Sequence, residues 1–211
     1  MQLDDSRIVA YFVRHGTTIL NQQDAFRGPI DAPLDAEGIR DAHKVATLLE
    51  PIEVSYIFHS DKKRTKKTAE IISSHKPDVE VFANQNLSAW NVGDLGGKPK
   101  SEENIQVVEY HVEHPDVPIP GGESLNSFRE RVRPLLQDAI EMGLHARIPP
   151  LLVVHSSVIH ELGTMIGGNH EYTLVEPGGV AVAYVDKGKL DAEPIFRPRP
   201  ETGLKRHEIV T

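Results

Sequence analysis

The chain has 211 residues and contains no cysteine, which excludes disulfide bridges and thiolate chemistry. No apolar run approaches the ~20 residues of a membrane-spanning helix. The first residues, MQLDD, are acidic where a secretory signal would be positively charged. The 23 lysines and arginines are outnumbered by 31 acidic residues, and no block of like charge is long enough to hold a polyanion. We therefore expect a cytoplasmic protein that binds neither nucleic acid nor a membrane.

Short apolar runs alternate with helical patterns along the chain. The predicted strands cover residues 7–13, 54–58, 79–83, 151–154, 180–185 and 193–196. The last two flank a hairpin turn around Gly188. This alternation predicts an α/β fold, a three-layer sandwich whose mostly parallel central sheet carries helices on both faces. The length favours a single domain over residues 1–211.

Helices are predicted where apolar residues recur at helical spacing. One begins at Asp35, a helix-capping residue, and another begins near Ser124, although Pro134 should kink or interrupt it. Residues 84–123 are polar and rich in glycine and proline, which predicts an insertion over the sheet edge with at most one short helix, near 101–113. The residues after Pro198 are expected to fray.

Polar residues follow three of the predicted strands. They are Arg14, His15, Gly16 and Thr17 after the first, His59, Ser60 and a helix carrying Arg64 after the second, and His155, Ser156 and Ser157 after the LLVV strand. Ligands of open α/β sheets bind outside the carboxyl ends of the strands, so two histidines and two arginines are expected to converge there. Such a cluster suits an anion, and an imidazole directed into it is a candidate nucleophile.

The basic helix SDKKRTKKTAEII offers a sharper test of this hypothesis. Its lysines form a solvated polar stripe, whereas Arg64 falls on the edge of the apolar stripe, where an unpaired guanidinium is costly. Each position also has a structural interpretation: Arg64 in an ion pair, Arg14 and His15 capped by backbone, and His155 as a packing residue. We favour ligand binding, because the three strand-end positions support one another.

Five segments together resemble the ordered signature of the histidine phosphatase superfamily, the phosphoglycerate mutase-like phosphatases. They are VRHGTTILN (13–21), FRGPIDAPLDAEG (26–38), HSDKKRTKKTAE (59–70), PGGES (120–124) and VVHSSVIHEL (153–162). The resemblance spans roughly residues 7–185. It implies a phosphoglycerate mutase-like fold and a phosphatase that hydrolyses a small phosphorylated substrate through a phosphohistidine at His15, with no metal and no cofactor.

The resemblance also implies roles for the residues around that histidine. Arg14, Arg64 and His155 would hold the non-bridging oxygens and stabilise charge in the transition state. Asn21 matches the phosphate-contacting asparagine of the family, and Thr17 would add a hydroxyl group.

One position departs from the family pattern. Members commonly carry a glutamate in L-x-E-x-x-x-G that protonates the leaving oxygen, whereas this chain reads LSAWNVGDLGG at 87–97 and has Ala89 there. General acid catalysis contributes on the order of 10²–10⁴ in rate, and its loss should affect alkyl esters most. Candidate replacements are Glu123 and Asp94, which can also be explained as a helix N-terminal charge and a turn residue.

The missing acid leaves alternatives open. A phosphohistidine or phosphoprotein phosphatase fits it, because imidazole leaves readily, and a regulatory module that binds a phosphate ligand with weak turnover is a second alternative. A mutase is disfavoured, because its substrate alcohol must be protonated and deprotonated in every cycle. Residues 84–123 are expected to line the mouth of the site, but neither the substrate nor the oligomeric state follows from the sequence.

Overall fold

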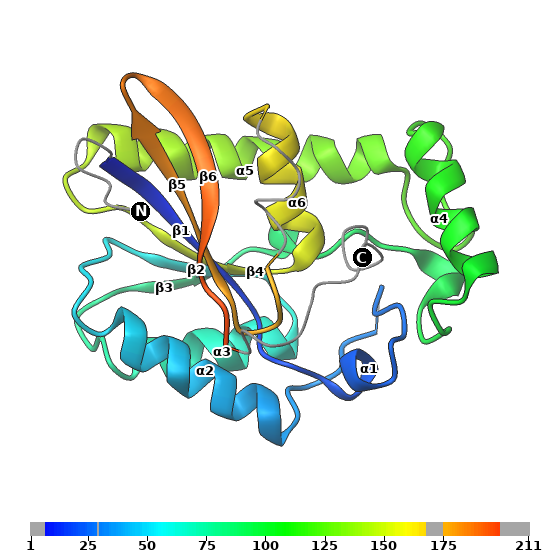
Figure 1. The fold of residues 1–211 in the computed structure, drawn as a ribbon, viewed down its shortest axis with the longest axis horizontal. Helices are drawn as coiled ribbons and strands as arrows, with labels where there is room; N and C mark the ends of the chain where they lie inside the picture. Colours follow the sequence, from blue (N-terminus) through cyan, green and yellow to red (C-terminus); the bar gives the residue numbers. More distant parts are fainter. Residues whose placement is uncertain (1–6, 29, 168–174, 199–211) are drawn as a thin grey trace.

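The computed structural model describes residues 7–28, 30–167 and 175–198 (Figure 1). Its centre is a six-stranded sheet in the order β3-β2-β4-β1-β5-β6. The strands are β1 (Arg7–Arg14), β2 (Ile57–His59), β3 (Val81–Ala83), β4 (Leu151–Val154), β5 (Val180–Asp186) and β6 (Lys189–Phe196). The first four pair in parallel, whereas β5 and β6 run antiparallel to their neighbours. The mostly parallel sheet is as predicted.

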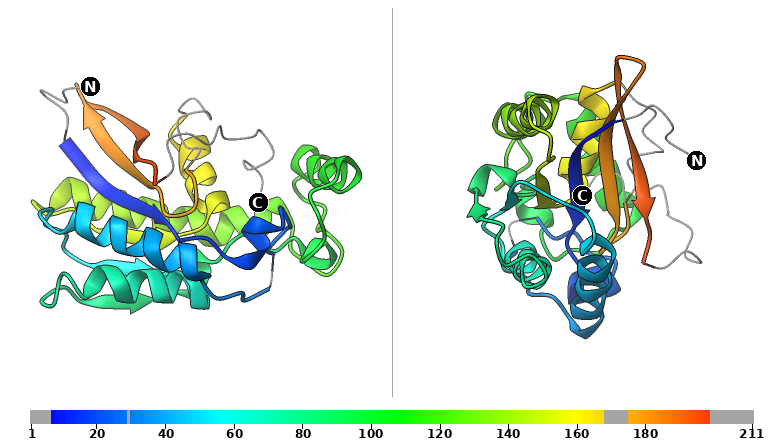
Figure 2. Two further views of the ribbon diagram at one scale, coloured as in Figure 1. Left: turned by 60° about the horizontal axis from the view of Figure 1, so that its bottom comes forward. Right: turned by 90° about the vertical axis from the view of Figure 1, so that its left-hand side faces the viewer.

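Helices cover both faces of this sheet (Figures 1 and 2). They are α1 (Ile19–Gln22), α2 (Ala36–Leu49), α3 (Lys63–Ser73), α4 (Glu102–Glu113), α5 (Leu125–His145) and α6 (Ser156–Met165), with two short 3-10 helices, η1 (Gln85–Leu87) and η2 (Gly93–Leu95). None of the helices in the described part of the chain has the length and apolar content that a bilayer crossing requires.

The strands are buried on both sides, and their alternating side chains divide the core into two layers. In β1, Tyr11 and Val13 pack in the layer formed with α2 and α3. Ala10 and Phe12 point the other way and pack with α5 and α6. This division produces the predicted three-layer α/β arrangement.

Several strand boundaries differ from the sequence prediction, including that of β3, which covers 81–83 instead of 79–83. Strand β2 covers 57–59 instead of 54–58, and β6 begins at Lys189, directly after the predicted turn at Gly188. Helix α5 is not interrupted at Pro134, one of the two outcomes expected there. Pro134 lies on the exposed side of α5, where the carbonyl that loses its partner can bond water, while Val132 and Leu136 keep the buried side in the core.

The segment 84–123 is more closely integrated than an insertion over the sheet edge. Its apolar side chains join the core layer of α5 and α6; they include Leu87, Trp90, Val92, Leu95, Val108 and Ile119. Its one α-helix, α4, lies beyond the N-terminal end of α5, on the side toward which β1 runs (Figure 1). The segment therefore stands next to the carboxyl ends of the parallel strands. The predicted fraying after Pro198 falls on residues outside the described ranges.

Candidate active site

The loop that follows β1 is fixed against the start of α2. A Cβ atom on Gly16 would come within 2.2 Å of the Gly38 carbonyl oxygen, so the two backbones touch. The Thr17 hydroxyl donates to Asp35 Oδ1 (2.8 Å), and the same Asp35 oxygen caps α2 by accepting from the Gly38 N–H (2.7 Å). These contacts hold the backbone that directly follows His15.

His15 is fully buried and presents one free ring nitrogen. Its Nδ1 lies 2.7 Å from the Gly16 carbonyl oxygen, and because a carbonyl only accepts, Nδ1 carries the hydrogen and Nε2 the lone pair. Nε2 has no hydrogen-bond partner among the described residues. Burial lowers the pKa of His15 well below its ordinary value, and nearby guanidinium charges lower it further; they belong to Arg64, Arg27 and Arg14. The ring is therefore neutral, with its lone pair available for attack.

His155 lies beside this ring. It follows β4 as the residue that precedes α6, and its ring meets the ring of His15 edge to face at a centroid distance of 5.2 Å. Its Nε2 bonds the Ser60 hydroxyl at 2.8 Å, which fixes the orientation of the imidazole. Burial lowers the pKa of His155 well below its ordinary value, and the charge of Arg64 adds to this effect. His155 is therefore a neutral imidazole in the same cluster.

Arg64 is fully buried in the first turn of α3, as its place on the apolar stripe indicated. One of its terminal nitrogens donates to the Ile30 carbonyl at 3.0 Å, but Nε and the other terminal nitrogen have no partner in the described part of the chain. Burial lowers the pKa of Arg64 to about 10, and the charge of Arg27 adds to this effect. A buried guanidinium with free N–H donors is arranged to receive an anion.

Arg14 and Arg27 complete the cationic cluster. Both side chains are buried, and Arg14 donates to the Val175 carbonyl oxygen at 2.7 Å. Sequence reasoning gave Arg27 no role, yet its charge lowers the pKa of His15 and of His155. Unlike Arg64, Arg27 lies in a stretch without a helical or strand period, so no local pattern indicated that it is buried.

Asn21 and Thr17 hold the loop itself. Asn21 Oδ1 accepts from the N–H (3.1 Å) and the hydroxyl (2.9 Å) of Thr18, so any phosphate contact of Asn21 falls to its amide nitrogen. The Thr17 hydroxyl hydrogen is donated to Asp35 and is not available to a phosphate while that bond persists. The phosphate contact predicted for Thr17 thus conflicts with this bond.

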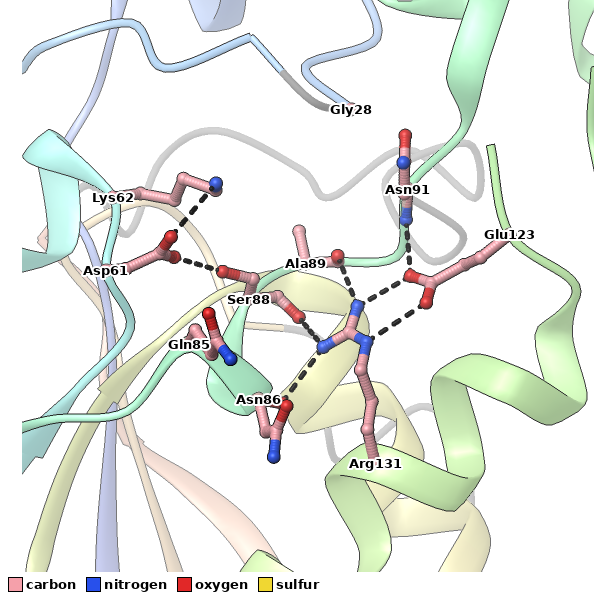
Figure 3. A pocket seen from close by; sticks show the side chains of 10 residues that line it. All are labelled: Gly28, Asp61, Lys62, Gln85, Asn86, Ser88, Ala89, Asn91, Glu123 and Arg131. Atoms are coloured by element: carbon pink, nitrogen blue, oxygen red, sulfur yellow. Dashed lines mark hydrogen bonds and ion pairs between the residues drawn. The ribbon is translucent and has the colours of Figure 1, made fainter. Parts of the chain in front are cut away.

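A pocket of about 290 Å³ lies among the side chains drawn in Figure 3. It is lined by Gly28, Asp61, Lys62, Gln85, Asn86, Ser88, Ala89, Asn91, Glu123 and Arg131. Lys62 lines the pocket and its charge lowers the pKa of His155, so the pocket borders the cluster. Ala89, the position of the missing acid, lies in its wall.

Neither Glu123 nor Asp94 is placed to donate a proton in this pocket. Glu123 lines it, but Oε1 accepts from the Asn91 N–H (2.8 Å) and from Arg131 (2.6 Å), and Oε2 accepts from Arg131 Nε (3.0 Å). A carboxylate whose two oxygens accept from N–H donors is in its ionised form. Asp94 is exposed in η2 and is not among the residues that line the pocket. Both remain better explained by structure than by catalysis.

The fold is that of the phosphoglycerate mutase-like phosphatases, with a histidine between arginines at the carboxyl ends of its parallel strands. A model of the histidine phosphatase superfamily (branch 1) matches residues 10–174, and the chain belongs to this superfamily. A relative described as "Probable phosphoglycerate mutase GpmB" of Escherichia coli O1:K1 is 33% identical over 165 residues, which cover 75% of this chain and 74% of the relative.

Solved structures have the same fold. A phosphoglycerate mutase from Bacillus anthracis superposes with a TM-score of 0.74 at 24% identity, covering 90% of this chain and 94% of that one. A mycobacterial glucosyl-3-phosphoglycerate phosphatase, solved with VO3, superposes with a TM-score of 0.72 at 19% identity, covering 90% and 99%. At sequence identities below 25%, these two structures show only that the chain has the same fold.

Proposed function

We propose that this chain is a phosphatase that hydrolyses a phosphomonoester, or a related phosphoryl compound, through a phosphohistidine intermediate at His15. One observation carries the proposal: next to buried guanidinium groups, the Nε2 atom of His15 is buried, unprotonated and without a hydrogen-bond partner in the described part of the chain. A neutral imidazole is a nucleophile, and the surrounding cations suit a tetrahedral oxyanion.

In the first step, Nε2 of His15 attacks phosphorus in line with the ester bond. The N–P bond forms, the P–O bond breaks, and its electron pair goes to the leaving oxygen. The guanidinium groups of Arg14, Arg27 and Arg64 balance the charge on the non-bridging oxygens. The Gly16 carbonyl keeps the hydrogen on Nδ1, so the ring is aligned before the substrate arrives.

In the second step, water attacks the phosphohistidine. The new O–P bond forms as the N–P bond breaks, and the electron pair returns to Nε2. Phosphate leaves, and the neutral ring is restored. The low pKa of His15 favours this outcome, because the released ring keeps its Nδ1 hydrogen and takes up no second proton at Nε2.

Hydrolysis of p-nitrophenyl phosphate tests the proposal. We expect turnover that His15→Ala abolishes and that the matched control His43→Ala, at an exposed histidine of α2, retains. Acid quench with radiolabelled substrate should trap phosphate on His15. Label on another residue, or turnover independent of His15, overturns the proposal. Phosphate binding without any turnover favours the regulatory module instead.

A second candidate is a phosphohistidine phosphatase. It is favoured by the pocket wall, where Ala89 supplies no acid and Glu123 is bound to Arg131. An imidazole leaving group needs less help than an alkoxide, so this enzyme would cleave phosphohistidine much faster than an alkyl phosphate. For this second candidate, the lack of an acid also disfavours mutase chemistry, and such an enzyme should convert little 3-phosphoglycerate in a mutase assay.

A further inference from the structure

The pocket beside Ala89 is lined by four side chains that carry charge: Asp61, Lys62, Glu123 and Arg131. Arg131 has no donor left for a ligand. Its five N–H groups make five hydrogen bonds, two to the carboxylate of Glu123 and three to backbone carbonyl oxygens. A guanidinium also does not release a proton in proteins. Neither Glu123 nor Arg131 can therefore protonate a leaving group.

Asp61 is likewise an ionised acceptor. Its Oδ1 accepts from the Ser88 hydroxyl at 2.5 Å, and its Oδ2 lies 3.4 Å from Lys62 Nζ. Burial alone would raise the pKa of Asp61, but the bond from Ser88 and the charge of Lys62 outweigh it and bring the pKa below its ordinary value. Asp61 has no proton to give at neutral pH.

Lys62 is the remaining charged group of the pocket wall. Its ammonium has three N–H donors, and among the described residues its hydrogen bonding is the long contact to Asp61. Figure 3 shows the ammonium group and the Ala89 methyl group directed toward the same space. The charge of Lys62 also lowers the pKa of His155, which places the ammonium within electrostatic reach of the reaction centre.

We infer that Lys62 takes over the task of the missing carboxylic acid and protonates the leaving oxygen of an alkyl phosphate. This inference rests on the proposed function. In the first step, the oxygen released from phosphorus takes a proton from the Lys62 ammonium as it receives the P–O electron pair. In the second step, the neutral amine takes a proton from the attacking water as the new O–P bond forms. Protons and electron pairs balance over the cycle.

The wall of the pocket also indicates the class of leaving group. Besides the charged groups, it presents the amide side chains of Gln85, Asn86 and Asn91, and no aromatic residue is among those that line it. A volume of about 290 Å³ is at the small end for a ligand site. This wall therefore suits a compact, hydroxylated leaving group.

Leaving-group dependence tests this inference. Glycerol phosphate and p-nitrophenyl phosphate differ in how much their leaving oxygens need a proton. We expect Lys62→Met to lower kcat/KM for glycerol phosphate roughly 100-fold or more and for the aryl ester by less than about tenfold. Lys66→Met, at an exposed lysine of the following helix α3, is the matched control and should change neither. Equal losses on both esters, or no loss on the alkyl ester, overturn the inference.

Two further variants separate proton transfer from charge alone. Lys62→Arg keeps the positive charge without a proton that is readily released, so alkyl-ester hydrolysis should stay low; full recovery overturns proton donation. Adding Ala89→Glu to Lys62→Met restores an acid at the neighbouring position and should recover part of the lost rate. Labelling of His15 distinguishes the two proposals: no label in the unmodified protein refutes the proposed function, whereas label with an unaltered leaving-group dependence in Lys62→Met refutes only this inference.

Discussion

The rings of His15 and His155 meet edge to face at an interplanar angle of 64° because β1 and β4 are in register. Arg14 pairs with Val154 in that register, so the residues that follow the two strands stand side by side. Both rings are buried, and burial lowers the pKa of each well below 6.5. The pair therefore stays neutral in the folded protein at pH values where free histidine is charged.

The stability of the protein should fall in mild acid. Each ring takes up a proton near pH 6.5 in the unfolded chain but not in the folded protein, so the unfolded state binds more protons. The free energy of unfolding should drop by about 1.4 kcal/mol per pH unit for each histidine below that value. Denaturant titrations from about pH 7 to about pH 5 measure the slope. His155→Asn should reduce this slope by the contribution of one histidine, whereas the exposed control His43→Asn should leave the slope unchanged.

Arg64→Met should stabilise the protein while it abolishes phosphate binding. The guanidinium is buried, and two of its nitrogens have no partner within residues 7–28, 30–167 and 175–198. Unsatisfied buried polar groups cost about 1–3 kcal/mol. We expect a higher Tm than that of the unmodified protein without ligand. Vanadate should raise the Tm of the unmodified protein and leave that of Arg64→Met unchanged. A lower Tm together with a retained response to vanadate would contradict this account of the site.

Gly38→Ala should disturb the catalytic loop although Gly38 lies in α2. A Cβ atom there would come within 2.2 Å of the Thr17 carbonyl oxygen, so the loop and the helix must separate. Overpacking of this kind costs about 1–3 kcal/mol. Phosphoenzyme formation should slow as well, because the backbone of His15 moves with the loop. Thr47→Ala, on the exposed side of α2, is the control for helix integrity, and equal behaviour of the two variants argues against the coupling.

Glu123→Gln should leave the leaving-group dependence unchanged. The carboxylate accepts hydrogen bonds from Arg131 and from the Asn91 N–H, so its removal affects the shape of the pocket wall for every substrate alike. A general acid would behave differently, with a selective loss on alkyl esters. Comparison of kcat/KM for glycerol phosphate and p-nitrophenyl phosphate decides between the two. A selective loss would return Glu123 to the role of acid.

Much of this site could be predicted from the sequence because it follows from the sheet. His15 and His155 come directly after apolar runs, and parallel strands bring their carboxyl ends together. The burial of Arg64 could be predicted because the helical period of its segment places it on the edge of the apolar stripe. Arg27 lies in a loop without a period, so its burial depends on tertiary contacts that no local pattern encodes.

Three other features of the structure could not be predicted from local sequence patterns. Lys62 precedes α3 with extended backbone angles, so the helical stripe that accounts for the other lysines says nothing about its direction. The pairing of Glu123 with Arg131 joins the loop before α5 to the second turn of that helix. Pro134 was expected to break α5, but the buried side of the helix does not require the hydrogen bond that proline removes.

Arg131 has a consequence for how this protein can change. It holds the wall of the pocket through the carbonyl oxygens of Asn86, Ser88 and Ala89, groups that every amino acid possesses. The side chains at these positions can therefore be exchanged without releasing the main chain that carries them. The guanidinium of Arg131 thus fixes the main chain of the pocket wall while the side chains that line the pocket can vary. Mutations in this wall could therefore change which ligand the pocket accepts without disturbing its backbone.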